Sequence, residues 1–240
     1  MKNFFKSTFI VSLYFLFLMN ITTISATEPI TDWVIRDFAT TIELTNNSTA
    51  IITEKITADC GNLPDKHGIF RSLPTGISTD AGFIEMPINL LSITDFSGQK
   101  INYSTSKQGH VITWKIGNAN KTVSGINEYQ IVYEVKKIIN HLNKNEDEFY
   151  WNILGPEWTL PIDNFSAQII FPKYLEENNV RIDSFYHQLT EQQLTDRGYS
   201  WTDTNTLTFR AKDLSPQQAL TVSLLFPKNF IAEYVPTFTE

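Results

Sequence analysis

The stretch from Glu128 to Val135, EYQIVYEV, is the clearest structural signal in this sequence. Apolar side chains fall on every second position, at Tyr129, Ile131, Tyr133 and Val135, and polar ones fall mostly between them. A period of two places the two sets of side chains on opposite faces of a β-strand. One apolar face and one polar face are typical of antiparallel sheets that pack on a core through a single face.

The same alternation recurs along most of the chain. It is found in the segments 34–44, 50–56, 111–116, 167–171, 206–211 and 220–226. The turn cluster Asn46-Asn47-Ser48 between the first two segments predicts a hairpin. In the first segment the expected inward face consists of Val34, Phe38, Ile42 and Leu44, interrupted by Arg36 and Thr40.

Helical signal is weak by comparison. Residues 174–178 and 190–194 could each form a turn or two, and 173–205 is the least regular region. We find no repeat, linker or sharp change of composition. The predicted fold is therefore all-β: one antiparallel β-sandwich, immunoglobulin-like or jelly-roll-like, over residues 28–231 with a C-terminal tail at 232–240.

The N-terminal residues predict export. Lys2 and Lys6 precede the apolar run FIVSLYFLFLM at 9–19, and Ile24-Ser25-Ala26 follows a short polar stretch. This order of charge, apolar core and small residue is that of a signal peptide, here residues 1–26 with cleavage near Ala26. The run is short for a membrane span, which needs about 20 apolar residues. An uncleaved N-terminal anchor is the alternative.

Charge and cysteine content exclude several classes of function. The chain has 19 basic and 26 acidic residues, and because the first 26 residues hold two lysines and no acid, the mature protein carries a net charge of −9. Such a surface disfavours nucleic acid, whose recognition needs basic clusters. Cys60 is the only cysteine, so no intramolecular disulfide forms. The 214 residues that remain after removal of the signal peptide must therefore be stabilised by packing of a hydrophobic core, and a chain of this length is long enough to form one.

Several short motifs line up in one order. They are Gly68-Ile69-Phe70-Arg71-Ser72-Leu73-Pro74, Trp114-Lys115-Ile116-Gly117, Phe149-Tyr150-Trp151-Asn152 with Gly155 and Trp158, and a closing segment that ends in Phe226-Pro227-Lys228. Together they resemble the N-terminal domain of domain of unknown function 2207 (DUF2207), a family of predicted bacterial membrane proteins. The resemblance covers nearly the whole mature chain.

The resemblance implies a signal peptide, an extracytoplasmic β-rich domain, transmembrane helices and a cytoplasmic tail. This sequence ends at Glu240 without the membrane segments. The expectation is therefore either a freestanding exported variant or the front part of a longer reading frame. The family supplies no catalytic residues to transfer.

Aromatic and polar side chains in two motifs form the candidate ligand-binding site. Trp151, Trp158 and Tyr150 lie close together with Asn152, and flat rings of this kind stack on sugars or peptides. The alternative is a folded corner in which the rings are buried. Arg71 is expected in a loop over 68–74, where a guanidinium either binds an anionic ligand or fixes the turn by bonding carboxylates and carbonyls.

Catalytic and metal-binding patterns are not recognisable. The four histidines share no motif, no hydrolase or nucleotide-binding signature is present, and spacing pairs no serine with a base. Asp65-x-His67 is half a metal or acid–base site at most. We expect no cofactor, no metal and no catalytic residues.

The leading functional hypothesis is a non-enzymatic envelope domain that binds a protein or glycan partner. Its expected location is the periplasm or the extracytoplasmic face of the membrane, with contact to the membrane only through an uncleaved N-terminus or a partner. The alternatives are a hydrolase of envelope polymers that uses an unidentified carboxylate pair, and a purely structural domain that packs on a membrane partner.

Overall fold

A computed structural model describes residues 32–79, 82–141 and 144–236. The predicted signal peptide and the end of the predicted tail lie outside the described residues. The all-β prediction is confirmed, because the described residues form strands with only two short 3₁₀ turns, Glu177–Asn179 and Glu191–Gln193.

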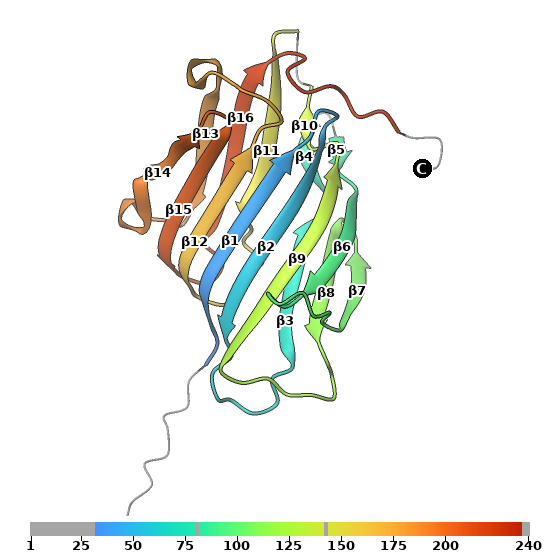
Figure 1. Ribbon diagram of the computed structural model, residues 1–240, viewed down its shortest axis with the longest axis vertical. Coiled ribbons are helices and arrows are strands. Elements are labelled where there is room, and N and C mark those ends of the chain that lie inside the picture. Colours follow the sequence, from blue (N-terminus) through green and yellow to red (C-terminus); the bar gives the residue numbers. More distant parts are fainter. Residues whose placement is uncertain (1–31, 80–81, 142–143, 237–240) are drawn as a thin grey trace, which may run out of the picture.

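One layer is a seven-stranded sheet (Figure 1). Its strands, in spatial order, are β14 (Leu194–Asp203), β15 (Thr206–Leu214), β12 (Ile162–Ile170), β1 (Val34–Leu44), β2 (Thr49–Asp59), β9 (Ile126–Lys136) and β6 (Ile88–Thr94). All pairs but one are antiparallel. β1 and β12 run parallel, a feature that side-chain alternation does not report.

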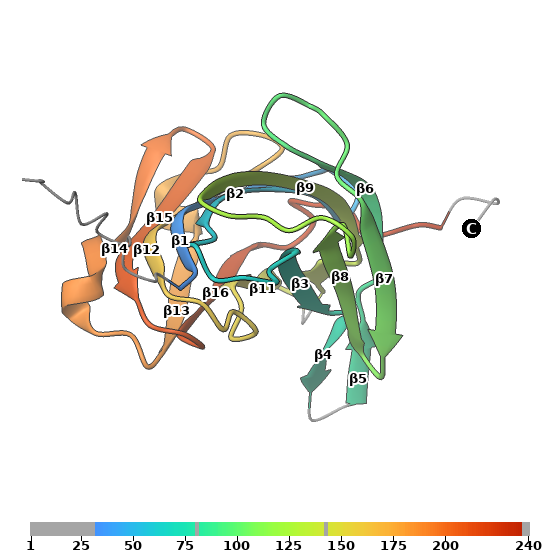
Figure 2. The same ribbon diagram turned by 90° about the horizontal axis from the view of Figure 1, so that it is seen from below.

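The second layer is divided into separate sheets. One contains β10 (Ile139–Asn140), β11 (Glu146–Leu154), β16 (Ala219–Pro227) and β13 (Arg181–His187), and another contains β3 (Gly68–Pro74), β8 (Val111–Gly117) and β7 (Tyr103–Gln108). β4 (Gly76–Thr79) and β5 (Gly82–Glu85) form a hairpin of their own. Figure 2 shows both larger sheets beneath the curved seven-stranded sheet, with β11 and β3 next to each other.

The core fills the space between the layers. The predicted inward faces of β9 and β16 are confirmed. Every second side chain from Tyr129 to Val135 is buried, and Leu220, Val222, Leu224 and Phe226 are buried together with Ser223 and Leu225 of the other face. Trp114 on β8 is fully buried against Tyr133. Aligned inward faces from two sheets are the basis of sandwich packing.

Three local predictions need correction. A register shift between Ile35 and Asp37 turns Ile35 into the core, so Val34 is only half-buried. A β-bulge of this kind changes the face to which later residues point. The irregular region 173–205 holds two strands, β13 and β14. Residues 68–74 form strand β3 rather than a loop.

No helix in the described ranges is both long and apolar enough to cross a bilayer.

Candidate functional site

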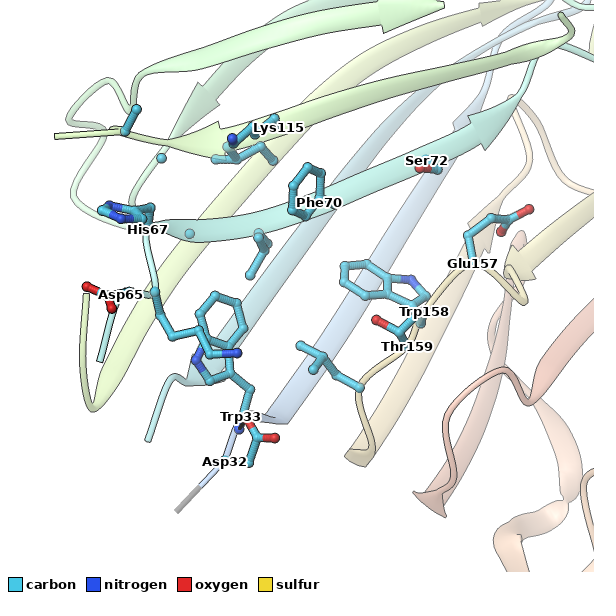
Figure 3. A pocket seen from close by; sticks show the side chains of 17 residues that line it. Asp32, Trp33, Asp65, His67, Phe70, Ser72, Lys115, Glu157, Trp158 and Thr159 are labelled. Carbon is cyan, nitrogen blue, oxygen red and sulfur yellow. Dashed lines mark hydrogen bonds between the residues drawn. The ribbon is translucent and has the colours of Figure 1, made fainter. Parts of the chain in front are cut away.

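The candidate site is a cleft in the second layer, beside the free edge of β3. β3 pairs only with β8, which leaves its other edge open. β11 pairs with β10 only at Phe149 and Glu148, so its edge is also open from Tyr150 onward. The end of β11 and the loop 155–160 that follows it lie across from the open edge of β3 (Figures 2 and 3).

Two adjoining cavities form this cleft. The larger has a volume of about 570 Å³ and lies between β3 and the loop 157–160, with Trp33 and Asp65 at one end. The smaller, of about 220 Å³, lies between β3 and β11. Glu157 lines both. Hereafter "the cleft" means these two cavities together.

The five predicted site residues all lie around the cleft. Arg71, Tyr150, Trp151 and Asn152 line the smaller cavity, and Trp158 lines the larger one. Both indoles are only 4% exposed. Their burial agrees with the folded-corner alternative, and ligand contact by these residues stays a prediction.

Tyr150 and Asn152 are half-buried on the same face of β11. The Tyr150 ring lies 6.5 Å from that of Phe185 on β13, and the Asn152 side-chain oxygen accepts a hydrogen bond of 2.6 Å from Thr221. The Asn152 side chain is thus held by the neighbouring strand β16.

Arg71 joins the two layers beneath the cleft. Its Nε and Nη2 donate to the two carboxylate oxygens of Glu54 on β2 at 2.8 and 2.6 Å. Tyr133 on β9 donates to the same carboxylate at 2.8 Å, and Arg71 Nη1 donates to the carbonyl of Ser72. Arg71 and Glu54 are 2% and 1% exposed. Arginine can therefore occupy an inward strand position between Ile69 and Leu73 because a bidentate carboxylate compensates its charge.

The electrostatics of this triad follow from its burial. Burial alone would lower the pKa of Arg71, but the charge and hydrogen bonds of Glu54 outweigh that effect and raise it above its usual value. Burial, reinforced by the Glu54 charge, raises the pKa of Tyr133 well above its usual range. Both groups therefore keep their protons at physiological pH. The positive charge of Arg71 is compensated by the carboxylate of Glu54.

Sequence reasoning anticipated that Arg71 would bond a carboxylate but did not identify the partner. Glu54 and Tyr133 lie 17 and 62 residues away on other strands. The available signal was a charged residue at an inward position on two strands, Arg71 among Ile69 and Leu73 and Glu54 among Ile52 and Ile56. Two such interruptions of opposite charge indicate a buried pair.

The larger cavity combines exposed aromatic surface with unused hydrogen-bond donors. Phe70 on β3 is 60% exposed, and Trp33 and Trp158 also line the cavity (Figure 3). The indole nitrogens of Trp33 and Trp158 are buried and have no hydrogen-bond partner among the described residues. A buried donor without an acceptor costs about 1–3 kcal/mol, and neither nitrogen is open to a ligand in this arrangement of the site.

Negative charge lies at the junction of the two cavities. The exposed Glu157 carboxylate forms no hydrogen bond or ion pair within the described part of the chain, and Asp32 and Asp65 line the far end of the larger cavity. Two lysines in the same cavity lie over aromatic rings, Lys66 over Trp33 at 5.4 Å and Lys115 over Phe70 at 5.8 Å. The described residues contain no group of three or more side chains suited to holding a metal ion.

Solved structures of low sequence identity match most of this chain, and only the likeness with a TM-score of 0.50 indicates a similar fold. Native leukotriene A4 hydrolase from Saccharomyces cerevisiae matches 81% of this chain at 11% sequence identity and a TM-score of 0.50. An M1 zinc metallopeptidase from Deinococcus radiodurans matches 80% of this chain at 9% sequence identity and a TM-score of 0.43. The match covers only 29% and 42% of those chains. No curated protein sequence matches.

A family described as the N-terminal domain of a predicted membrane protein, DUF2207, matches residues 34–226, from the first described strand to the last. The expected resemblance is thereby confirmed over most of the chain. This chain belongs to the DUF2207 family.

Proposed function

We propose that this domain is an extracytoplasmic binding module that holds an extended segment of a partner protein in the cleft. The observation that carries this proposal is the division of the second layer, which leaves the open edges of β3 and β11 on the two sides of one cleft. An open strand edge presents main-chain donors and acceptors that an incoming strand can pair with.

The side chains at this edge favour an incoming strand. Natural edge strands are commonly protected by charged side chains or proline. β3 has its proline only at its last residue, Pro74, and the outward position in its middle is the exposed Phe70. The seven residues of β3 would span about 23 Å in extended form, enough for several ladder positions. The two cavities succeed each other along this edge, so they can receive different side chains of one ligand.

The charge of the cleft indicates the composition of the ligand. Glu54 compensates the charge of Arg71, and Glu157 also interacts electrostatically with Arg71, so the three groups together leave one net negative charge between the cavities. A lysine or arginine flanked by apolar residues would place its cation near Glu157 and its apolar neighbours against Phe70 and in the smaller cavity.

Selection from a random dodecapeptide library tests this proposal. Peptides selected on the wild type are expected to carry a basic residue between apolar ones. Phe70→Ser should weaken their binding at least about tenfold, because apolar contact with the ring is lost. Glu157→Gln should weaken it and reduce its dependence on salt.

Phe96→Ser is the matched control, since Phe96 is also exposed and has a lysine over its ring, Lys55 at 5.8 Å, but it follows β6 of the seven-stranded sheet and lines neither cavity. If peptides bind all these variants equally well, the cleft is not the binding site. If no peptide is selected while soluble cell-wall oligosaccharides bind in a Phe70-dependent way, the ligand is a glycan.

A further inference from the structure

A second cluster of chemically active side chains lies at the other end of the sandwich, independent of the cleft. His141 Nδ1 is 2.9 Å from Asp147 Oδ1, and His141 Nε2 is 3.1 Å from Ser48 Oγ. These are the contacts of a serine–histidine–aspartate relay, in which a carboxylate orients an imidazole that takes the serine proton. Sequence spacing could not reveal it, because 93 residues separate Ser48 from His141.

Each member of the cluster is fixed by the fold. Ser48 lies in the turn between β1 and β2 with φ of 56°, a left-handed conformation that non-glycine residues adopt at tight turns and strained sites. Asp147, on β11, is fully buried, and it also accepts from Lys228 Nζ at 2.7 Å and from the main-chain N–H of Asn229. The carboxylate is thus held in a fixed position by its donors, where it can accept a hydrogen bond from His141 Nδ1.

A cavity of about 300 Å³ opens onto this cluster. Ser48, His141, Asn140, Lys137 and Tyr234 contribute to its lining. The Lys137 ammonium and the Asn140 amide, which also donates to Glu148 at 3.3 Å, are side-chain donors there for a carbonyl oxygen that develops negative charge. The volume is at the small end of ligand pockets, which limits a substrate to a short acyl group.

The C-terminal segment closes the site. Ser48 is 1% exposed and donates its only proton to the carbonyl of Ala232 at 2.7 Å, so His141 cannot receive it in this arrangement. Segment 228–234 is anchored by the buried Ile231, by Lys228 on Asp147, and by the Ala232 N–H on the carbonyl of Asn46. Displacement of this segment would free both the hydroxyl and its proton.

We propose that Ser48, His141 and Asp147 form an acyl-transfer site for small carboxylic esters, closed by segment 228–234. When the segment is displaced, Ser48 Oγ attacks the ester carbonyl while its proton passes to His141 Nε2. The bond to the leaving alkoxide breaks and that oxygen takes the proton, giving an alcohol and an acyl-serine. Water, deprotonated by the same imidazole, then releases the carboxylic acid and restores Ser48. Asp147 is a positioning residue throughout.

Labelling of the purified protein with a fluorophosphonate probe tests this assignment. The adduct should map to Ser48, be absent from Ser48→Ala, and form at least about 100-fold more slowly in His141→Gln. His187→Gln, at an exposed histidine, should label like the wild type. In Asp147→Asn the pH profile of labelling should shift, which a purely structural carboxylate would not cause.

Loosening the covering segment should accelerate the reaction. Ile231→Ser removes its apolar anchor and is expected to raise the labelling rate at least tenfold over the wild type. If this variant does not fold, Lys228→Gln frees the same segment from Asp147 without changing the core. Absence of any Ser48 adduct in the wild type and in a folded loosened variant would overturn the proposal and leave the cluster as a fastening for segment 228–234.

Discussion

The buried pair between Glu54 and Arg71 gives the most quantitative prediction. Arg71→Met keeps the apolar part of the side chain but leaves the Glu54 carboxylate, 1% exposed, with the Tyr133 hydroxyl as its one remaining side-chain partner among the described residues. Removal of one member of a buried ion pair costs about 3–5 kcal/mol. A domain of this kind unfolds with about 5–15 kcal/mol, so the variant should fold but be clearly less stable.

The assay is urea denaturation followed by tryptophan fluorescence. With a slope of about 2 kcal/mol per molar urea, a loss of about 4 kcal/mol lowers the midpoint by about 2 M. Tyr133→Phe removes one hydrogen bond to a charged group and should cost about 1.5–3 kcal/mol. The double variant Glu54→Leu/Arg71→Met should recover most of the stability lost by Arg71→Met, because it leaves no unpaired charge.

Arg36→Met is the matched control on the surface. Arg36 forms ion pairs with Asp59 and Asp163 but is half-exposed, so its loss should change the midpoint much less. An Arg71→Met variant as stable as Arg36→Met, or a double variant no more stable than the single one, would refute the account of a buried, mutually dependent pair.

Four further outcomes follow from local geometry. Trp158→Ala should cost about 3–5 kcal/mol in the same assay, because the ring packs edge-on against Phe38 at 5.2 Å; an unchanged midpoint would show that the indole is not in the core. Gly117→Ala should lower the free energy of unfolding by at least about 2 kcal/mol, since φ of Gly117 is +135° and a Cβ would lie 1.8 Å from the His67 carbonyl oxygen. Gly109→Ala, where a Cβ would meet open space, should lower it less. The Cys60 thiol is buried, so Ellman's reagent should react with it only on unfolding, and fast labelling of the native protein would contradict this. Burial also raises the pKa of this thiol, so the stability of the fold should fall as the pH rises above about 8.5, the pKa of an unfolded cysteine. The hydrogen bond from Arg36 lowers the pKa of Asp59, so the ionised Asp59 stabilises the fold above the unfolded pKa of about 3.9, and this stabilisation is lost as the pH falls below it. Asp59→Asn should therefore make the loss of stability at acidic pH less steep.

The strand pattern was readable from the sequence because burial of one face forces a period of two. The hairpin of β1 and β2, the inward face of β9 and the burial of Trp114 all follow from that rule. The bulge at Arg36 and the parallel pairing of β1 with β12 could not be predicted in this way, since neither changes the period of two outside the bulge. Strands β13 and β14 were missed because their exposed positions are mixed in polarity.

The candidate site was only partly predictable for a different reason. Arg71, Tyr150 and Trp158 belong to two motifs that are far apart in sequence, and local spacing could not show that they surround one cleft. The same limit hid Ser48 and His141, which meet only because two turns and the C-terminal segment converge. Contacts of this kind depend on strand order, and strand order is set by the packing of the whole chain.

Amide hydrogen exchange with and without a library-selected dodecapeptide tests the central claim, that the open edge of β3 receives an extended ligand. The account predicts slower exchange on peptide binding in residues 68–74 and 150–160, while β13 at 181–187 stays unchanged. Protection confined to β13 or to other surfaces, with residues 68–74 exchanging as fast as before, would contradict it.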